Sequence, residues 1–117
     1  MKKIKLVLFI ILCVNAVSAQ IKISIEDVSK HIGDSVTVCS QVFGTKATEK
    51  ITYINLGAAY PASLLTIIIF AKDNANFKDA PSSLYSNKKL CVTGTIKDYK
   101  GKIEIIVTKP EDISISE

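Results

Sequence analysis

Apolar and polar residues alternate along most of the chain after residue 34, a pattern typical of β-strands with one buried face. Five stretches either alternate in this way or are apolar enough for a buried strand: residues 35–43, 51–56, 64–70, 89–97 and 103–108. The third stretch is apolar on both faces, so we expect it at the centre of the sheet. The pattern predicts a small all-β domain.

Two turn sequences predict which strands are joined directly. "GAAYPAS", between the second and third stretches, contains Gly57 and Pro61 and predicts a hairpin. "DYKG", between the fourth and fifth, contains Gly101 and predicts another. Which residues of 51–56 face outward stays open, because both alternating sets are partly apolar.

A short helix is predicted before the first strand. Ser24 can cap it, with Asp27 three residues later as a weaker form of the capping box. Lys30 and His31 complement the C-terminal end, and Gly33 suits the left-handed residue just past it. His31 is therefore interpreted as a helix-end residue rather than a catalytic base or metal ligand.

The apolar residues of the helical regions predict how they attach to the sheet. Val28 and Ile32 lie four residues apart and would both dock on the sheet. A second short helix is expected between 64–70 and 89–97, starting at Asp73 or Asn74. Phe77 supplies its apolar anchor, and Pro81 prevents it from being long.

Residues 1–19 have the pattern of a secretory signal peptide. A lysine-rich start precedes the apolar run 6–14, and Val17 and Ala19 are small residues before a cut ahead of Gln20. The alternative is a membrane anchor, but a spanning helix needs about 20 apolar residues, and Asn15 ends this run too early. We expect an exported product, periplasmic or secreted, with residues 20–117 as its single domain.

Removal of the first 19 residues changes the charge of the protein. The full chain holds 15 lysines, no arginine and 11 acidic residues, for a net charge of +4. Three lysines and no acidic residue lie in 1–19, so 12 lysines and 11 acidic residues remain, a net charge of +1. This weakens a purely electrostatic case for nucleic-acid binding.

The cysteines are compatible with one structural disulfide. Cys13 lies in the segment expected to be removed, which leaves Cys39 and Cys91. Each points away from the apolar face of its strand, so the two could bridge if their strands are antiparallel neighbours. The alternative is two separate buried thiols. No C-x-x-C motif is present, which argues against a redox centre.

The order of three strands, a short helix and two strands resembles the OB-fold, the small Greek-key barrel. The stretches "HIGDSVTVCSQV", "TYINLGAAYP", "LTIIIFAKDNANF" and "LYSNKKLCVTGTIKDYKGKIEIIVTKPEDI" resemble exported bacterial OB-fold proteins, which are grouped with tRNA-anticodon-type nucleic-acid-binding domains. The resemblance implies a five-stranded Greek-key barrel with a short N-terminal helix and a short helix between strands 3 and 4. Its first and fourth strands would be antiparallel neighbours, as a bridge between Cys39 and Cys91 requires.

The resemblance also implies a place for a ligand. In nucleic-acid-binding members the ligand crosses the second and third strands, between the loops after the first and fourth. Lysines could track phosphates there, and tyrosine rings could stack on bases. The candidate residues on this face and its loops are Lys46, Lys50, Tyr53, Tyr60, Lys97, Tyr99, Lys100 and Lys102.

Other interpretations of these residues remain open. Lysine-bearing turns are commonly just solvated, and lysine also discourages pairing at a sheet edge. Tyr60 could pack the hairpin beside Pro61, and Tyr99 could cover the end of the barrel. The competing function is an envelope adaptor that binds a protein or a glycan through the same face.

The sequence contains no recognisable catalytic motif. Its acidic residues are scattered, no His, Cys or Asp group has metal-ligand spacing, and neither a G-x-S-x-G elbow nor a phosphate-binding glycine loop is present. We therefore expect a non-catalytic binding module, with no catalytic residue, no metal and no cofactor. Single-stranded nucleic acid is its leading expected partner.

Overall fold

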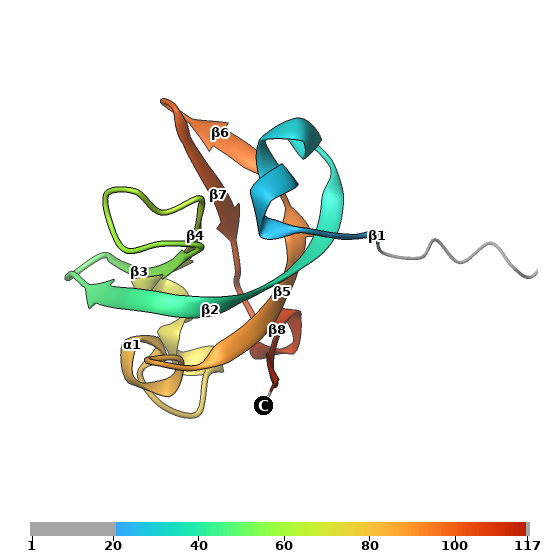
Figure 1. The fold of residues 1–117 in the computed structure, drawn as a ribbon. Coiled ribbons are helices and arrows are strands. Elements are labelled where there is room, and N and C mark those ends of the chain that lie inside the picture. The colour runs from blue at the N-terminus through green and yellow to red at the C-terminus, as the bar shows by residue number, and fades with distance from the viewer. Residues whose placement is uncertain (1–20, 117) are drawn as a thin grey trace, which may run out of the picture.

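The computed structural model describes residues 21–116, so the expected signal peptide and its cleavage site lie outside the described residues. Figure 1 shows strands wrapped around a core with short helices at the margins. The strands are β1 (Ile21–Ile23), β2 (Ser35–Ala47), β3 (Ile51–Leu56), β4 (Leu65–Phe70), β5 (Lys89–Thr95), β6 (Lys97–Tyr99), β7 (Lys102–Ile106) and β8 (Ile113–Ser116). The helices are the 3₁₀ helices η2 (Ile25–His31), η3 (Ala71–Asn76) and η4 (Pro110–Asp112), and the α-helix α1 (Pro81–Leu84). Within 21–116, none of the helices is long and apolar enough to cross a membrane.

One sheet contains all the strands, in the order β6-β7-β4-β3-β2-β5-β8, with β1 added in parallel beside β2. The long strand β2 joins two halves of this sheet, one formed with β5 and β8 and the other with β3, β4, β7 and β6 (Figure 1). Its first part pairs antiparallel with β5, and its last part pairs antiparallel with β3 after a register shift between Val42 and Gly44. The hydrogen-bonded sheet is not closed, but only Ile96 separates β5 from β6. The chain itself thus links the two halves at that point.

The core lies inside this curved sheet. Leu56, Ile67, Val92 and Ile105 from four different strands are completely buried there, as alternation on strands with one inward face requires. Gly94 marks where β5 comes closest to β7. A Cβ at this position would lie 2.6 Å from Cγ2 of Ile105, so only glycine fits without a shift.

The five strands expected from the pattern are all present, but some of their ends differ. The first continues beyond residue 43 to Ala47, because the segment after the bulge pairs with β3. The fourth breaks at Ile96, and the fifth runs from Lys102 to Ile106. The short strands β1 and β8 were not expected. Each forms by pairing with a strand that is not its neighbour in a hairpin, β1 with β2 and β8 with β5.

The helix before β2 is present as η2, with Ser24 as its N-cap and Gly33 at a φ of +91°. The hydroxyl of Ser24 donates to the carboxylate of Glu26 and accepts from the Glu26 N–H. The expected capping box with the Asp27 side chain is therefore wrong, and Asp27 contacts Ser24 only through its backbone N–H, which donates to the Ser24 carbonyl at 2.9 Å. Near the C-terminal end, Nδ1 of His31 lies 3.0 Å from Oδ2 of Asp34, as fits a helix-end residue.

Two further expectations about the helices are wrong. Val28 is buried, but Ile32 is 43% exposed, because the 3₁₀ helix has three residues per turn and ends at His31. Phe77 is buried as expected after η3. Pro81 does not limit that helix; it occupies the first position of α1, where its missing N–H costs nothing.

The disulfide between Cys39 and Cys91 is present. These residues are direct partners in the antiparallel pairing of β2 with β5, with their Cα atoms 3.9 Å apart. The alternative of two separate buried thiols is thereby excluded. The pairing also confirms that the first and fourth expected strands are antiparallel neighbours.

Candidate functional site

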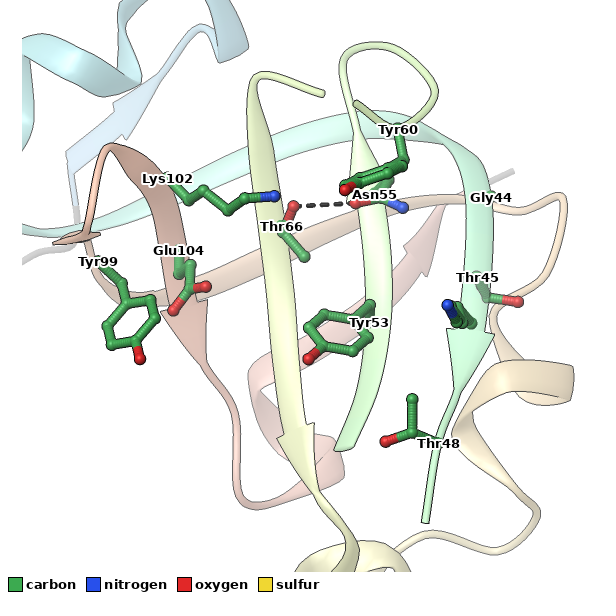
Figure 2. A pocket seen from close by; sticks show the side chains of 11 residues that line it. Gly44, Thr45, Thr48, Tyr53, Asn55, Tyr60, Thr66, Tyr99, Lys102 and Glu104 are labelled. Carbon is green, nitrogen blue, oxygen red and sulfur yellow. Dashed lines mark hydrogen bonds between the residues drawn. The ribbon is translucent and has the colours of Figure 1, made fainter. Parts of the chain in front are cut away.

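A groove of about 550 Å³ lies on the outer face of the sheet, over β3, β4 and β7 and the end of β2 (Figure 2). The strands place it by simple alternation. Ile54 and Leu56 of β3 belong to the core, so Tyr53 and Asn55 lie on the opposite face of the strand, where Asn55 is still only 7% exposed. The lining residues are Gly44, Thr45, Lys46, Thr48, Tyr53, Asn55, Tyr60, Thr66, Tyr99, Lys102 and Glu104.

Three of these side chains form one polar row across the floor of the groove. Asn55 on β3 is the register partner of Thr66 on β4, and Thr66 is the partner of Glu104 on β7. The hydroxyl of Thr66 donates to Oδ1 of Asn55 at 2.9 Å (Figure 2). We call Asn55, Thr66 and Glu104 the polar row.

An aromatic ring and a lysine flank the polar row on one side. Tyr53 lies two residues before Asn55 on the same face of β3, and its register partners are Lys46 on β2 and Ile68 on β4. Ile68 is only 3% exposed although it lies outside the main core. Tyr53 therefore has an apolar residue, Ile68, as its neighbour on one side and Lys46, at the edge of this part of the sheet, on the other.

Two more tyrosines line the groove, Tyr60 on the side of the row opposite Tyr53 and Tyr99 beyond the Glu104 end of the row (Figure 2). Tyr99 on β6 is the register partner of Lys102 on β7. Tyr60 belongs to the hairpin between β3 and β4, and Nζ of Lys102 lies 4.7 Å from the centroid of its ring. Tyr60 is 67% exposed and Tyr99 52%. Figure 2 shows the Tyr60 ring at the Asn55 end of the polar row, with the Lys102 side chain reaching toward it.

Glu104 is the one carboxylate in the groove. Burial raises the pKa of its carboxyl group above the usual value, while Lys97 and Lys102 act in the opposite direction. Neither lysine amine is close enough to the Glu104 carboxylate for an ion pair. This carboxylate also has no hydrogen-bond partner among residues 21–116. This acceptor is thus free to bind a ligand.

The structure brings five of the eight residues expected at the site together in the groove lining: Lys46, Tyr53, Tyr60, Tyr99 and Lys102. The other three lie outside it. Lys50 is in the turn between β2 and β3. Lys97 is on β6, where it is the register partner of Glu104 on β7. Lys100 sits in the turn after β6, where its Nζ lies 5.4 Å from the centroid of the Tyr99 ring.

Sequence reasoning missed the polar row. Asn55 and Thr66 are polar positions within two largely apolar strands, which was a usable signal. Nothing in the sequence revealed that they are register partners, and Glu104 resembled any solvated glutamate on an alternating strand.

The described part of the chain offers no arrangement typical of a metal site. No group of three or more His, Cys, Asp or Glu side chains lies close enough to hold an ion within residues 21–116. His31 pairs with Asp34 and is not in the groove lining. What the groove presents is a set of rings, amines and hydrogen-bonding groups.

No protein-family model and no curated protein matches the chain. Solved structures do. The Schizosaccharomyces pombe (S. pombe) Stn1–Ten1 complex matches over 86% of this chain and 80% of the matched chain, with a TM-score of 0.64 at 14% identity. An OBody bound to hen egg-white lysozyme matches over 86% and 98%, with a TM-score of 0.57 at 12% identity.

An asparaginyl-tRNA synthetase from Pyrococcus horikoshii matches over 82% of this chain, with a TM-score of 0.56 at 12% identity. This chain spans only 23% of that synthetase. At such identities the likeness concerns the fold. Together with the order of the strands, it establishes that residues 21–116 adopt an OB-fold.

Proposed function

We propose that the chain is a non-catalytic binding module whose groove takes single-stranded nucleic acid. The observation that carries this proposal is the gathering of three tyrosine rings and two lysines around one groove on the outer face of the sheet. The face is the one that nucleic-acid-binding OB-folds use, over their second and third strands.

The tyrosines supply stacking surfaces. Tyr60 and Tyr99 keep more than half of their surface exposed, so their rings are available to a ligand. Every base has a flat face that can stack on such a ring, and this contact is worth about 1–3 kcal/mol per base. Tyr53 and Tyr60 flank the polar row on opposite sides, which suits successive bases of an extended strand.

The lysines supply contacts to phosphates. Lys46 on β2 and Lys102 on β7 lie on opposite sides of β3 and β4 in the sheet order. A strand crossing β3 and β4 therefore meets a cation at either end of its path. Two lysines and no arginine give a modest electrostatic contribution, so we expect weak binding that depends on salt.

The test is a titration of a fluorescently labelled thymidine 12-mer, followed by anisotropy, as salt rises from about 50 to about 200 mM. Two phosphate contacts predict a loss of affinity of about sevenfold over this range. The double variant Lys46→Ala/Lys102→Ala should bind more weakly and lose most of the salt dependence. The matched control is Lys22→Ala/Lys109→Ala, which removes two exposed lysines outside the groove lining. Absence of binding at low salt would contradict the proposal.

A protein partner is the second candidate. Exposed tyrosines are enriched at protein interfaces, and one of the structurally similar proteins is an OBody bound to lysozyme. An adaptor of this kind would retain a co-purifying protein after nuclease treatment. Its binding would also be largely indifferent to the Lys46→Ala/Lys102→Ala replacement.

Export of the protein is part of the proposal. The bridge between Cys39 and Cys91 supports it, because disulfides persist mainly in oxidising compartments outside the cytosol. The mass of the protein recovered from its native host should correspond to a chain that starts at Gln20 and has no free thiol. A product that retains residues 1–19 would contradict the expected cleavage.

A further inference from the structure

The polar row presents hydrogen-bonding groups in a fixed order. The Thr66 hydroxyl donates a hydrogen bond to Oδ1 of Asn55. This bond fixes the orientation of the amide, so Nδ2 is the group that can donate to a ligand. Nδ2 has no hydrogen-bond partner among residues 21–116, and the Asn55 residue is 7% exposed at the floor of the groove. One end of the row therefore offers N–H donors.

The other end of the row offers only acceptors. The carboxylate of Glu104 has two oxygens and no partner in the described part of the chain. A phosphate would be repelled from this part of the floor. The nucleic-acid backbone is thus directed toward Lys46 and Lys102, and the floor is left for a group that carries N–H donors.

The spacing of the two ends suits the edge of a base. Asn55 and Glu104 lie two strands apart, which places their backbones about 10 Å from each other. The side chains of Asn55 and Glu104 extend from these backbones into the groove, and the space between their polar ends suits one flat heterocycle. Tyr60, which Figure 2 shows at the Asn55 end of the row, can stack on the part of that heterocycle nearest to Asn55.

Among the bases, guanine matches this order of groups. Its Watson–Crick edge carries the O6 acceptor and, next to it, two adjacent donors, N1–H and the N2 amino group. The two donors suit one carboxylate in bidentate fashion, and O6 suits the amide N–H. Adenine and cytosine have one donor group on this edge, and thymine has a single N–H between two carbonyl groups. Single-stranded bases are commonly recognised on such edges.

We propose that Asn55 and Glu104 form a guanine-selective subsite in the groove. The proposal rests on the proposed function and adds that one base of the bound strand is distinguished from the others. Glu104 accepts from N1–H and the amino group, Asn55 donates to O6, and Tyr60 stacks on the ring.

The test compares thymidine decamers that differ only at one central base. We expect the decamer with a central guanine to bind about tenfold more tightly than the all-thymidine decamer. Inosine, which lacks the amino group, should fall between them. O6-methylguanine, which lacks N1–H, should lose the preference.

Variants assign the effect to the row. In Glu104→Gln the preference for guanine should fall below about twofold, because a glutamine amide has a single acceptor oxygen and cannot accept from N1–H and the amino group in bidentate fashion. Glu111→Gln removes the same charge from an exposed position outside the groove lining and should keep the preference. The base substitutions need no variant, so they test the subsite even if Glu104→Gln folds poorly.

The outcomes separate this proposal from the one it rests on. Equal binding of all decamers with a clear salt dependence would overturn the guanine subsite and leave the nucleic-acid interface standing. A preference that survives in Glu104→Gln would also overturn the subsite. Failure of every decamer to bind at low salt would overturn both.

Discussion

Nζ of Lys102 lies 4.7 Å from the centroid of the Tyr60 ring, and this contact joins β7 to the hairpin between β3 and β4 across the groove. A cation over a tyrosine face contributes about 0.5–1 kcal/mol at an exposed site. The contact holds an otherwise exposed ring at the Asn55 end of the polar row. In the proposed complex, the contact would also hold this amine near the phosphate of a nucleotide whose base stacks on Tyr60.

Loss of the stacking rings should weaken nucleic-acid binding. Tyr53→Ala and Tyr60→Ala should each lower the affinity for a thymidine 12-mer at least about fivefold, because each removes one stacking partner. The matched control is Phe43→Ala, which removes a ring that is 49% exposed but not in the groove lining. Anisotropy titration measures all three. An effect of Phe43→Ala equal to that of the tyrosine variants would point to a different binding face.

The disulfide should contribute to stability without shaping the groove. Cys39 and Cys91 are 52 residues apart in sequence, and closing such a loop stabilises the fold by up to about 4 kcal/mol. Cys39→Ser/Cys91→Ser should therefore unfold at a clearly lower urea concentration. Oligonucleotide affinity of the folded variant should stay within about twofold, since neither cysteine is in the groove lining. An unchanged urea midpoint would contradict the stabilising role.

Gly94 tests the close approach of β5 and β7. In Gly94→Ala the new methyl group would lie 2.6 Å from Cγ2 of Ile105, so we expect a loss of about 1–3 kcal/mol from overpacking. Thr95→Ala changes the adjacent exposed position and should cost much less. Urea denaturation of both variants gives the comparison, and equal midpoints would show that the two strands are not in contact here.

Glu104 should make stability depend on pH. Burial raises the pKa of its carboxyl group in the folded state, so the folded protein binds the proton more tightly than the unfolded chain does. Stability therefore falls as pH rises from the ordinary value of 4.5 through the raised one. Above that window Glu104→Gln should melt at a higher temperature than the original protein.

The difference in melting temperature between Glu104→Gln and the original protein should disappear below about pH 4, where the side chain at position 104 is neutral in both. The charged groups near this carboxyl, Lys97 and Lys102, keep the effect small because they favour its ionised form. Glu111→Gln is the control for the change in net charge. A melting temperature that is lower for Glu104→Gln at neutral pH would contradict the cost assigned to burial.

Alternation and turn residues were sufficient to predict the main strands and both hairpins. Alternation also indicated that Cys39 and Cys91 point away from the apolar faces of their strands, because facing direction on a strand is a local property. That these strands are antiparallel neighbours was implied only by the resemblance to the OB-fold. Alternation and turn residues could not predict β1 and β8, whose short sequences become strands only by pairing with distant ones. The end of η2 was wrong for a related reason: the four-residue spacing of Val28 and Ile32 presumes an α-helix.

The site was predictable only in part. Rings and amines were visible as residue types near the expected face, so Tyr53 and Lys102 could be named from the sequence. The polar row depends on register between three strands, which alternation alone does not determine. Its members therefore became recognisable only when β3, β4 and β7 were seen side by side.

The most direct test of the central claim is a ¹H–¹⁵N NMR titration of residues 20–117 with a thymidine 12-mer at low salt. If the groove is the binding face, the amide signals of Tyr53, Asn55 and Thr66 and of the hairpin around Tyr60 shift first and furthest. Shifts confined to Lys88 and Lys89, which line a separate depression beside Ile115, would contradict the account. So would a spectrum that the oligonucleotide leaves unchanged.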